Sequence, residues 1–211
     1  MAKIDVYNLE RQKVGEIELA DAVFATDVKE QLLHEVVVAQ LASRRSGTHA
    51  AKERAAVAGS KKKLYRQKGT GNARHGSIGA PIYVGGGRAH PPRPQDWSYR
   101  PPRRVRQGAL CSALSLLLKE GRLTVVDEFQ FADPKTKRFA RILEALRAPR
   151  CTLVVDDGSN QNLKLSIRNL ERSQFLPPEG VNVYDLLRHE HLLVSRTAAK
   201  ALEARCLEKS S

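Results

Sequence analysis

The N-terminal part of the chain alternates between apolar and polar positions and then changes to a helical period. Apolar side chains fall on one face of residues 3–8, and residues 14–19 repeat the pattern after a polar turn. This period of two predicts a pair of strands. From Asp27, a plausible N-cap, apolar residues recur at helical spacing and predict a helix to about Ser43. Its apolar side carries Leu32, Leu33, Val36, Val37 and Leu41.

The C-terminal half alternates short apolar runs with amphipathic stretches. After Pro101 and Pro102 a helical pattern covers residues 105–118 and ends at Gly121. Three further helices are expected: one opened by Asp133 as N-cap and Pro134, one over about 162–170, and one from Thr197 as cap to about 207. A brief helical turn is expected at residues 184–187.

Short apolar runs between these helices predict strands at residues 123–126, 152–155, 174–176 and 192–194. Strands that alternate with helices favour a sheet whose strands are mostly parallel. The predicted fold class is therefore α/β, with a mostly parallel sheet flanked by helices.

Residues 46–100 interrupt this alternation and lack the side chains of a core. Their large aliphatic residues are Val57, Leu64, Ile78, Ile82 and Val84. These are too few to offset the entropy of ordering such a segment. We expect one α/β globular domain over residues 1–211, interrupted at 46–100 by a long extension that becomes ordered only on a partner.

Charge identifies the kind of partner. Residues 44–106 contain sixteen Lys and Arg against two acids, Glu53 and Asp96, and so carry +14, whereas the whole chain carries +13. The rest of the chain therefore sums to −1. Positive charge concentrated in a segment without a core favours binding to a polyanion, with released counterions supplying the free energy.

Several other classes of protein are disfavoured. No apolar run approaches the ~18 residues of a spanning helix, so we expect no membrane partner. The N-terminus has neither a signal-peptide nor a transit-peptide pattern, which favours a cytoplasmic protein. Cys111, Cys151 and Cys206 lack metal-ligand spacing and are expected to be reduced, buried thiols. We expect neither a cofactor nor a metal.

Residues 65–76, YRQKGTGNARHG, hold the densest candidate chemistry. They fail as a phosphate-binding loop of an enzyme, because no Gly-Lys-Ser/Thr closes them, no buried strand precedes them and Arg74 stands where a dinucleotide fingerprint has its third glycine. Glycines here allow close backbone approach to RNA, and the cations suit phosphates. A flexible linker is the alternative, but interleaved aromatic residues favour base stacking.

The predicted RNA-binding residues are the basic side chains of this region with nearby polar, aromatic and glycine positions. They are Arg44, Arg45, Lys52, Arg54, Lys61, Lys62, Lys63, Tyr65, Arg66, Gln67, Lys68, Gly69, Gly71, Arg74, His75, Arg88, Arg93, Trp97, Arg100, Arg103, Arg104 and Arg106. Arg103, Arg104 and Arg106 open a predicted helix, where the helix dipole disfavours cations. Nearby phosphates would explain them.

Other candidates have two readings. Residues 85–87, Gly-Gly-Gly, are either a tight turn or a point of close RNA approach. Asp127, Asp156 and Asp157 follow predicted strands, where enzymes place acids, but acids there also begin turns and caps. His189 and His191 lack metal-site spacing and are expected in an exposed polar turn.

At these residues the chain resembles a known family, the bacterial type of the universal large-subunit ribosomal protein four. The resemblance rests on RQKGTG at 66–71, Ala73-Arg74, GSI at 76–78, the glycines at 85–87 and RPQD at 93–96. It extends to HEVVVA at 34–39, KTK at 135–137, RNL at 168–170 and NVYD at 182–185. Asn72 and residues 90–92, His-Pro-Pro, depart from the usual pattern.

The resemblance implies a structural constituent of the large ribosomal subunit with no enzymatic activity. Its partners would be large-subunit (23S-type) rRNA, neighbouring ribosomal proteins and the nascent peptide. The extension would assist assembly, and its tip, residues 65–74, would lie at the nascent-peptide exit tunnel. The residues lining the tunnel would be Arg66, Gln67, Lys68, Gly69 and Thr70. Some family members also bind their own messenger RNA, and an RNA-directed enzyme using the strand-end acids is the competing hypothesis.

Overall fold

A six-stranded sheet forms the centre of the fold, in the order β2-β1-β3-β6-β4-β5. Only the N-terminal hairpin, β1 with β2, pairs antiparallel, whereas every other neighbouring pair is parallel. The strands are β1 (Ala2–Tyr7), β2 (Lys13–Leu19), β3 (Leu123–Val126), β4 (Thr152–Val155), β5 (Gln174–Leu176) and β6 (His191–Ser195). The predicted α/β class with a mostly parallel sheet is confirmed.

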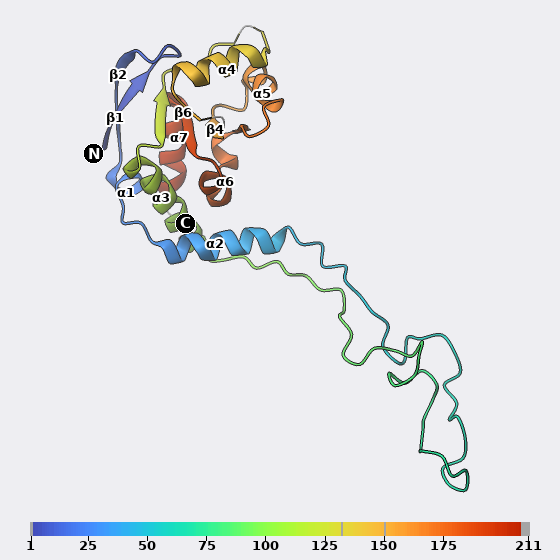
Figure 1. Ribbon diagram of the computed structural model, residues 1–211. Coiled ribbons are helices and arrows are strands. Elements are labelled where there is room, and N and C mark those ends of the chain that lie inside the picture. The colour runs from blue at the N-terminus through green and yellow to red at the C-terminus, as the bar shows by residue number, and fades with distance from the viewer. Residues whose placement is uncertain (1, 132, 150, 208–211) are drawn as a thin grey trace. The chain divides into compact units, whose positions relative to one another are not determined.

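The computed structural model describes residues 2–131, 133–149 and 151–207. Figure 1 shows the helices that connect and flank the strands. They are α1 (Asp21–Phe24), α2 (Glu30–Ser43), α3 (Arg103–Lys119), α4 (Thr136–Ala145), α5 (Gln161–Arg168), the 3-10 helix η1 (Pro178–Gly180), α6 (Val183–Arg188) and α7 (Arg196–Leu207). The described helices include none with the length and apolar character needed to cross a bilayer.

The chain divides into two units. The globular unit comprises Met1–Gln40 and Arg100–Ser211, and the inserted unit comprises Leu41–Tyr99. The sheet and nearly all the helical residues belong to the globular unit, and α2 runs from it into the inserted unit. Each unit has its own internal contacts and is described below by itself.

Successive strand residues face opposite sides of the sheet, and each side has its own core. Leu153 and Val155 belong to the larger core, whereas Val154 between them belongs to the smaller one. Buried residues of α1, α2, α3, α6 and α7 complete the larger core, and those of α4 and α5 complete the smaller. Burial on both faces explains why β3, β4 and β6 read as continuous apolar runs.

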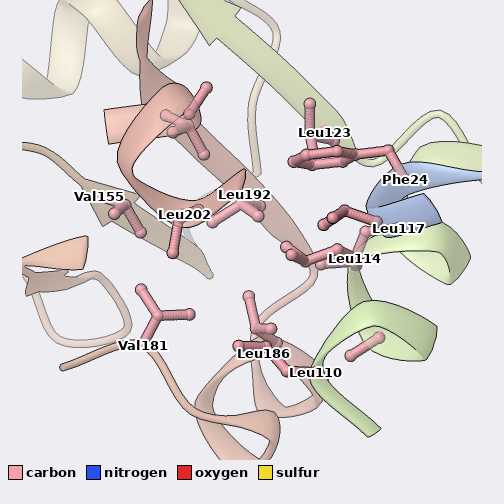
Figure 2. Packing of buried hydrophobic residues seen from close by; sticks show 14 of the residues in the cluster. Phe24, Leu110, Leu114, Leu117, Leu123, Val155, Val181, Leu186, Leu192 and Leu202 are labelled. Carbon is pink, nitrogen blue, oxygen red and sulfur yellow. The ribbon is translucent and has the colours of Figure 1, made fainter. Parts of the chain in front are cut away.

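The larger core contains several leucines that are almost completely buried. Leu114 and Leu117 of α3 are at most 1% exposed, and Leu192 of β6 and Leu202 of α7 are each 1% exposed. Figure 2 shows these leucines converging from three elements on one apolar centre. Such burial contributes roughly 25 cal/mol per Å² of apolar surface, which makes this core the main source of stability in the unit.

Three predicted helix starts are wrong. Helix α2 begins at Glu30, and the carbonyl of Lys29, not Asp27, accepts the first N–H bonds, from Leu32 and Leu33. Helix α4 begins at Thr136, with Lys135 extended in the N-cap position and no side-chain cap. At α7 the Ser195 hydroxyl accepts from the Ala198 N–H, so Ser195, not Thr197, acts as the cap.

These differences have a common physical reason. Buried contacts along a helix fix its position, whereas one cap contributes only about 1 kcal/mol.

The four-residue α1 was not predicted, because it is too short to show a period. Leu41, expected on the apolar side of α2, is 43% exposed in the last turn, which belongs to the inserted unit.

Two cysteines far apart in sequence meet between α3 and α7. Cys111 and Cys206 are free thiols, half-buried where full burial was predicted, and they are hydrogen-bonded to each other. The Cys206 thiol bond lowers the pKa of Cys111 against the opposing effect of burial. The same hydrogen bond and burial raise the pKa of Cys206, so the pair keeps its remaining proton on Cys206.

Cys111 should therefore react with iodoacetamide at neutral pH faster than Cys206. Because the depressed pKa comes mainly from the Cys206 donor, a Cys206→Ala variant should raise the Cys111 pKa and slow its alkylation at pH 7 several-fold. Mass-spectrometric rates over a pH series measure the effect. A Cys151→Ala variant is the control, and equal rates for Cys111 in both variants would contradict the pairing.

Candidate nucleic-acid interface

The inserted unit is built from two chain segments that run antiparallel and are joined by backbone hydrogen bonds. Near one end Gln95 N–H donates to Gly47 O over 3.1 Å. Further along, Ala51 N–H donates to Pro92 O over 3.1 Å and Arg88 N–H to Lys52 O over 2.9 Å. Residues 45–102, all of them described, contain no helix or strand. These few bonds hold an otherwise irregular backbone.

The inserted unit contributes no residue to either core cluster. Leu64, Ile78 and Ile82 are 40%, 52% and 69% exposed. The prediction that this segment lacks a core is confirmed for these residues. That it becomes ordered only on a partner stays a prediction.

Basic side chains cover the surface of the inserted unit. The predicted cations from Lys52 to Arg93 are all exposed. Arg45 lies over the Trp97 ring, 4.0 Å from its centroid, and so ties a cation to the aromatic side chain expected to stack on a base. This arrangement leaves a positive, solvent-facing surface of the kind that attracts phosphates.

Both acids of residues 44–106 have partners within the segment. Glu53 accepts from the Arg93 guanidinium over 2.7 Å. Asp96 accepts from the backbone N–H and the hydroxyl of Ser98 over 2.8 and 2.7 Å, and these bonds lower its pKa. The Asp96 carboxylate therefore stays charged at neutral pH, yet the two acids together offset only a small part of the sixteen cations.

The predicted tip, residues 65–74, folds back on itself through local bonds. The Tyr65 hydroxyl donates to Ala73 O, and Arg66 Nη2 donates to Gly69 O over 2.9 Å. Gly69 and Gly71 have φ of +83° and +70°, a left-handed backbone that glycine adopts without strain. Arg66 therefore closes the turn and also presents an exposed positive charge. Lys68 is exposed as well.

His75 packs against two tyrosines, an arrangement that the sequence did not reveal. Its ring centroid lies 6.2 Å from that of Tyr65 and 5.3 Å from that of Tyr83, both edge-on. Burial among these groups raises the pKa of Tyr83. The three rings form a small aromatic cluster inside the unit, so Tyr65 is already in contact with a protein ring before any base is bound.

The glycines at 86 and 87 are required by the fold of the inserted unit. A Cβ on Gly87 would lie 2.3 Å from Arg54 N, and one on Gly86 would lie 2.1 Å from Ala80 O. Gly87 also donates to Gly79 O over 3.0 Å. Close approach of the protein's own backbone is thus sufficient to explain both glycines. By contrast, a Cβ on Gly76 would meet nothing within 4 Å.

The strand-end acids make local contacts at turns and near the start of α7. Asp156 is 7% exposed and accepts from the Asn160 amide over 3.1 Å. Asp157 accepts from the Ser159 hydroxyl over 3.0 Å, and Asp127 lies 3.9 Å from the Arg196 guanidinium. These contacts support the turn-and-cap reading of the acids.

The two C-terminal histidines are not in an exposed turn, and that prediction is wrong. His189 is 4% exposed, and its Nδ1 lies 2.7 Å from Asp185 O. The Nε2 of His191 lies 2.9 Å from Thr124 Oγ1, and burial, with Arg122 nearby, lowers the His191 pKa. Across the described ranges, no group of three or more His, Cys, Asp or Glu side chains could hold a metal.

The globular unit carries a second cationic feature at the start of α3. Four arginines surround a cavity of about 390 Å³ there. The lining residues are Arg100, Arg103, Arg106, Gln107, Leu110 and Arg205. Sequence reasoning found the first three arginines but missed Arg205, because this residue comes from α7. Arg104, also predicted, is exposed in the first turn of α3 and does not line the cavity.

An α/β domain interrupted by a basic, glycine-rich segment without a core is typical of a class, the nucleic-acid-binding proteins. A narrower assignment comes from known proteins. The profile of the ribosomal protein L4/L1 family matches residues 17–205, so the chain belongs to this family. The family is one of structural proteins, and the prediction that the chain is not an enzyme is confirmed.

Three curated relatives carry the name "Large ribosomal subunit protein uL4". The relative from Anaeromyxobacter sp. (strain K) is 53% identical over 204 residues, covering 97% of this chain and 98% of that protein. The one from Desulforudis audaxviator (strain MP104C) is 50% identical over 198 residues, covering 94% and 96%. The one from Myxococcus xanthus (strain DK1622) is 48% identical over 203 residues, covering 96% and 98%. The predicted bacterial family is confirmed.

Proposed function

We propose that the chain is a structural constituent of the large ribosomal subunit whose inserted unit binds large-subunit rRNA. The observation that carries this proposal is the cation density of the inserted unit: residues 41–99 hold twelve exposed Lys and Arg against two acids, a net charge of +10 on a backbone without a core. Such a surface gains its affinity from many phosphates at once and tracks an irregular RNA surface. Family membership supports the ribosome, and thus the cytoplasm, as the place where it acts.

The proposal extends to the tip. Residues 65–74 combine two left-handed glycines with exposed cations, which allows the backbone to come close to RNA. We infer that Arg66, Gln67, Lys68, Gly69 and Thr70 line the nascent-peptide exit tunnel and meet the growing chain. Neighbouring ribosomal proteins and rRNA are the remaining partners, and the extension assists assembly by filling gaps between RNA helices.

Reversing the charge at the tip tests this proposal. Subunits carrying Lys68→Glu should assemble, because removing one of many phosphate contacts lowers the salt dependence of binding by only about one unit of slope. The new carboxylate among phosphates should distort the tunnel wall. Sensitivity to drugs that bind in the tunnel, and stalling by arrest peptides, should therefore change several-fold.

The control is Lys164→Glu, which makes the same charge change at an exposed position of α5. Both variants should co-sediment with large subunits after a high-salt wash. If Lys68→Glu ribosomes matched the control in drug sensitivity, stalling and chemical probing of the rRNA around the tunnel, the tip would have to lie elsewhere.

A further inference from the structure

The arginine-lined cavity at the start of α3 is assembled by folding and is not simply part of the basic run. Arg103 and Arg106 come from the first turn of α3, whereas Arg205 comes from the last turn of α7. All of its lining residues belong to the globular unit. Arg100, Arg106 and Arg205 bring three like-charged guanidinium groups to about 390 Å³ of open space, an arrangement that an anion would stabilise.

Arg205 is held in place by the globular unit. Its Nη1 donates to Pro178 O over 2.7 Å and to Val181 O over 2.9 Å. Both acceptors are neutral carbonyls, so these bonds orient the guanidinium without neutralising its charge. The position in the last turn of α7 also suits a cation, because the C-terminal end of a helix carries partial negative charge. An oriented guanidinium fork matches the geometry of a phosphate.

Arg106 supplies an unsatisfied donor. Its Nε is buried and has no hydrogen-bond partner among the described residues. A buried donor left without a partner costs free energy, and proteins satisfy nearly all such groups. The first turn of α3 contains no acidic side chain that would offset the positive end of the helix dipole. An anion bound against the Arg106 guanidinium would compensate the positive charge gathered at this end of α3.

We propose that this cavity is a seat for one backbone phosphate of RNA, with Arg106 and Arg205 as its principal donors and Arg100 at its margin. The class of ligand rests on the proposed function, whereas the existence of an anion seat rests on the cavity alone. Arginine forks and helix N–H groups read the sugar-phosphate backbone and not the bases. The seat therefore fixes where an RNA strand crosses the globular unit and carries no sequence preference.

The experiment follows the arginine Nε–Hε signals of the full-length protein by NMR, during titration with inorganic phosphate and, separately, with a short oligouridylate. Signals of Arg106 and Arg205 should shift saturably with both ligands. In Arg106→Gln the Arg205 signal should need about tenfold more of either ligand for the same shift, because a charge-assisted donor is lost. The control Arg141→Gln removes the same charge from an exposed position of α4 and should change neither titration.

Three outcomes would overturn the proposal. Signals of Arg106 and Arg205 that stay fixed with both ligands would remove the seat. A response to inorganic phosphate alone would leave a site for a free anion and not for RNA. Equal weakening in Arg106→Gln and Arg141→Gln would mean diffuse screening. None depends on the tunnel, so a failure of the Lys68→Glu test would leave these titrations unaffected.

Discussion

Replacing residues 46–100 with a short Gly-Ser linker should reduce affinity for large-subunit rRNA by about 10³-fold or more at physiological salt. The deletion removes eleven Lys and Arg residues and two acids, so the net charge of the chain falls from +13 to +4. Each lost phosphate contact also flattens the dependence of binding on salt. Filter binding to rRNA over a series of salt concentrations measures both changes.

The same variant should keep the free energy of unfolding of the globular unit nearly unchanged. The residues of both core clusters come from residues 4–36 and 109–202, outside the deleted segment. Shortening a loop changes closure entropy by only about 0.6 kcal/mol per halving of length. Urea unfolding should stay cooperative, and loss of that transition would show that the segment supports the core.

A full-length control separates charge from chain length. Changing Lys61, Lys62 and Lys63 to Gln removes three cations from exposed positions while the backbone connection stays intact. This variant should lose an intermediate share of the rRNA affinity and salt dependence. If it bound like wild type while the deletion variant did not bind, shape and not charge would dominate the interaction.

Gly87→Ala should damage rRNA binding strongly, although it adds only a single methyl group to the inserted unit. Its Cβ would lie 2.3 Å from Arg54 N and 2.5 Å from Glu53 C, backbone atoms that cannot rotate away. The two segments must separate there, which breaks the bond from Arg88 N–H to Lys52 O. Overpacking of this kind costs about 1–3 kcal/mol, equivalent to a roughly 5- to 150-fold loss of affinity.

The matched control is Gly76→Ala, whose Cβ would meet nothing within 4 Å and whose φ is not in the left-handed region. It should bind rRNA as wild type does. Amide exchange at Arg88 in the bound state gives a second readout, faster only in Gly87→Ala. Equal affinities for the two variants would mean that the bound segment does not use this close approach.

The sequence predicted the order and type of most elements because burial leaves a clear pattern. Leu153, Val154 and Val155 are consecutive apolar residues because both faces of β4 are covered, and Leu114 and Leu117 recur on one side of α3. Helix starts were less predictable. Ser and Thr are both suitable N-cap residues, so the sequence does not distinguish Ser195 from Thr197. The backbone at the end of β6 places the Ser195 hydroxyl where it accepts a hydrogen bond from the Ala198 N–H.

Contacts between residues far apart in the sequence limited how much of the candidate site could be predicted. Charge identified the basic segment, but nothing near Arg205 in the sequence indicated that α7 brings it to the start of α3. The burial of His189 was also missed, because it depends on the fold around this residue. Its neighbours are polar, yet its own ring bonds to Asp185 O and is buried by the fold. The roles of Gly86 and Gly87 likewise required the positions of Ala80 and Arg54.

The paired backbone of the inserted unit constrains how its length can change in evolution. Backbone hydrogen bonds pair Gly47 with Gln95, Ala51 with Pro92, and Lys52 with Arg88. Residue numbers therefore rise along one segment while those of the bonded partners fall along the other. A single-residue deletion on one side shifts every partner beyond it, whereas compensated deletions on both sides shorten the unit and keep its register. Length variation among relatives should therefore occur in balanced pairs, or beyond the last bond at the tip.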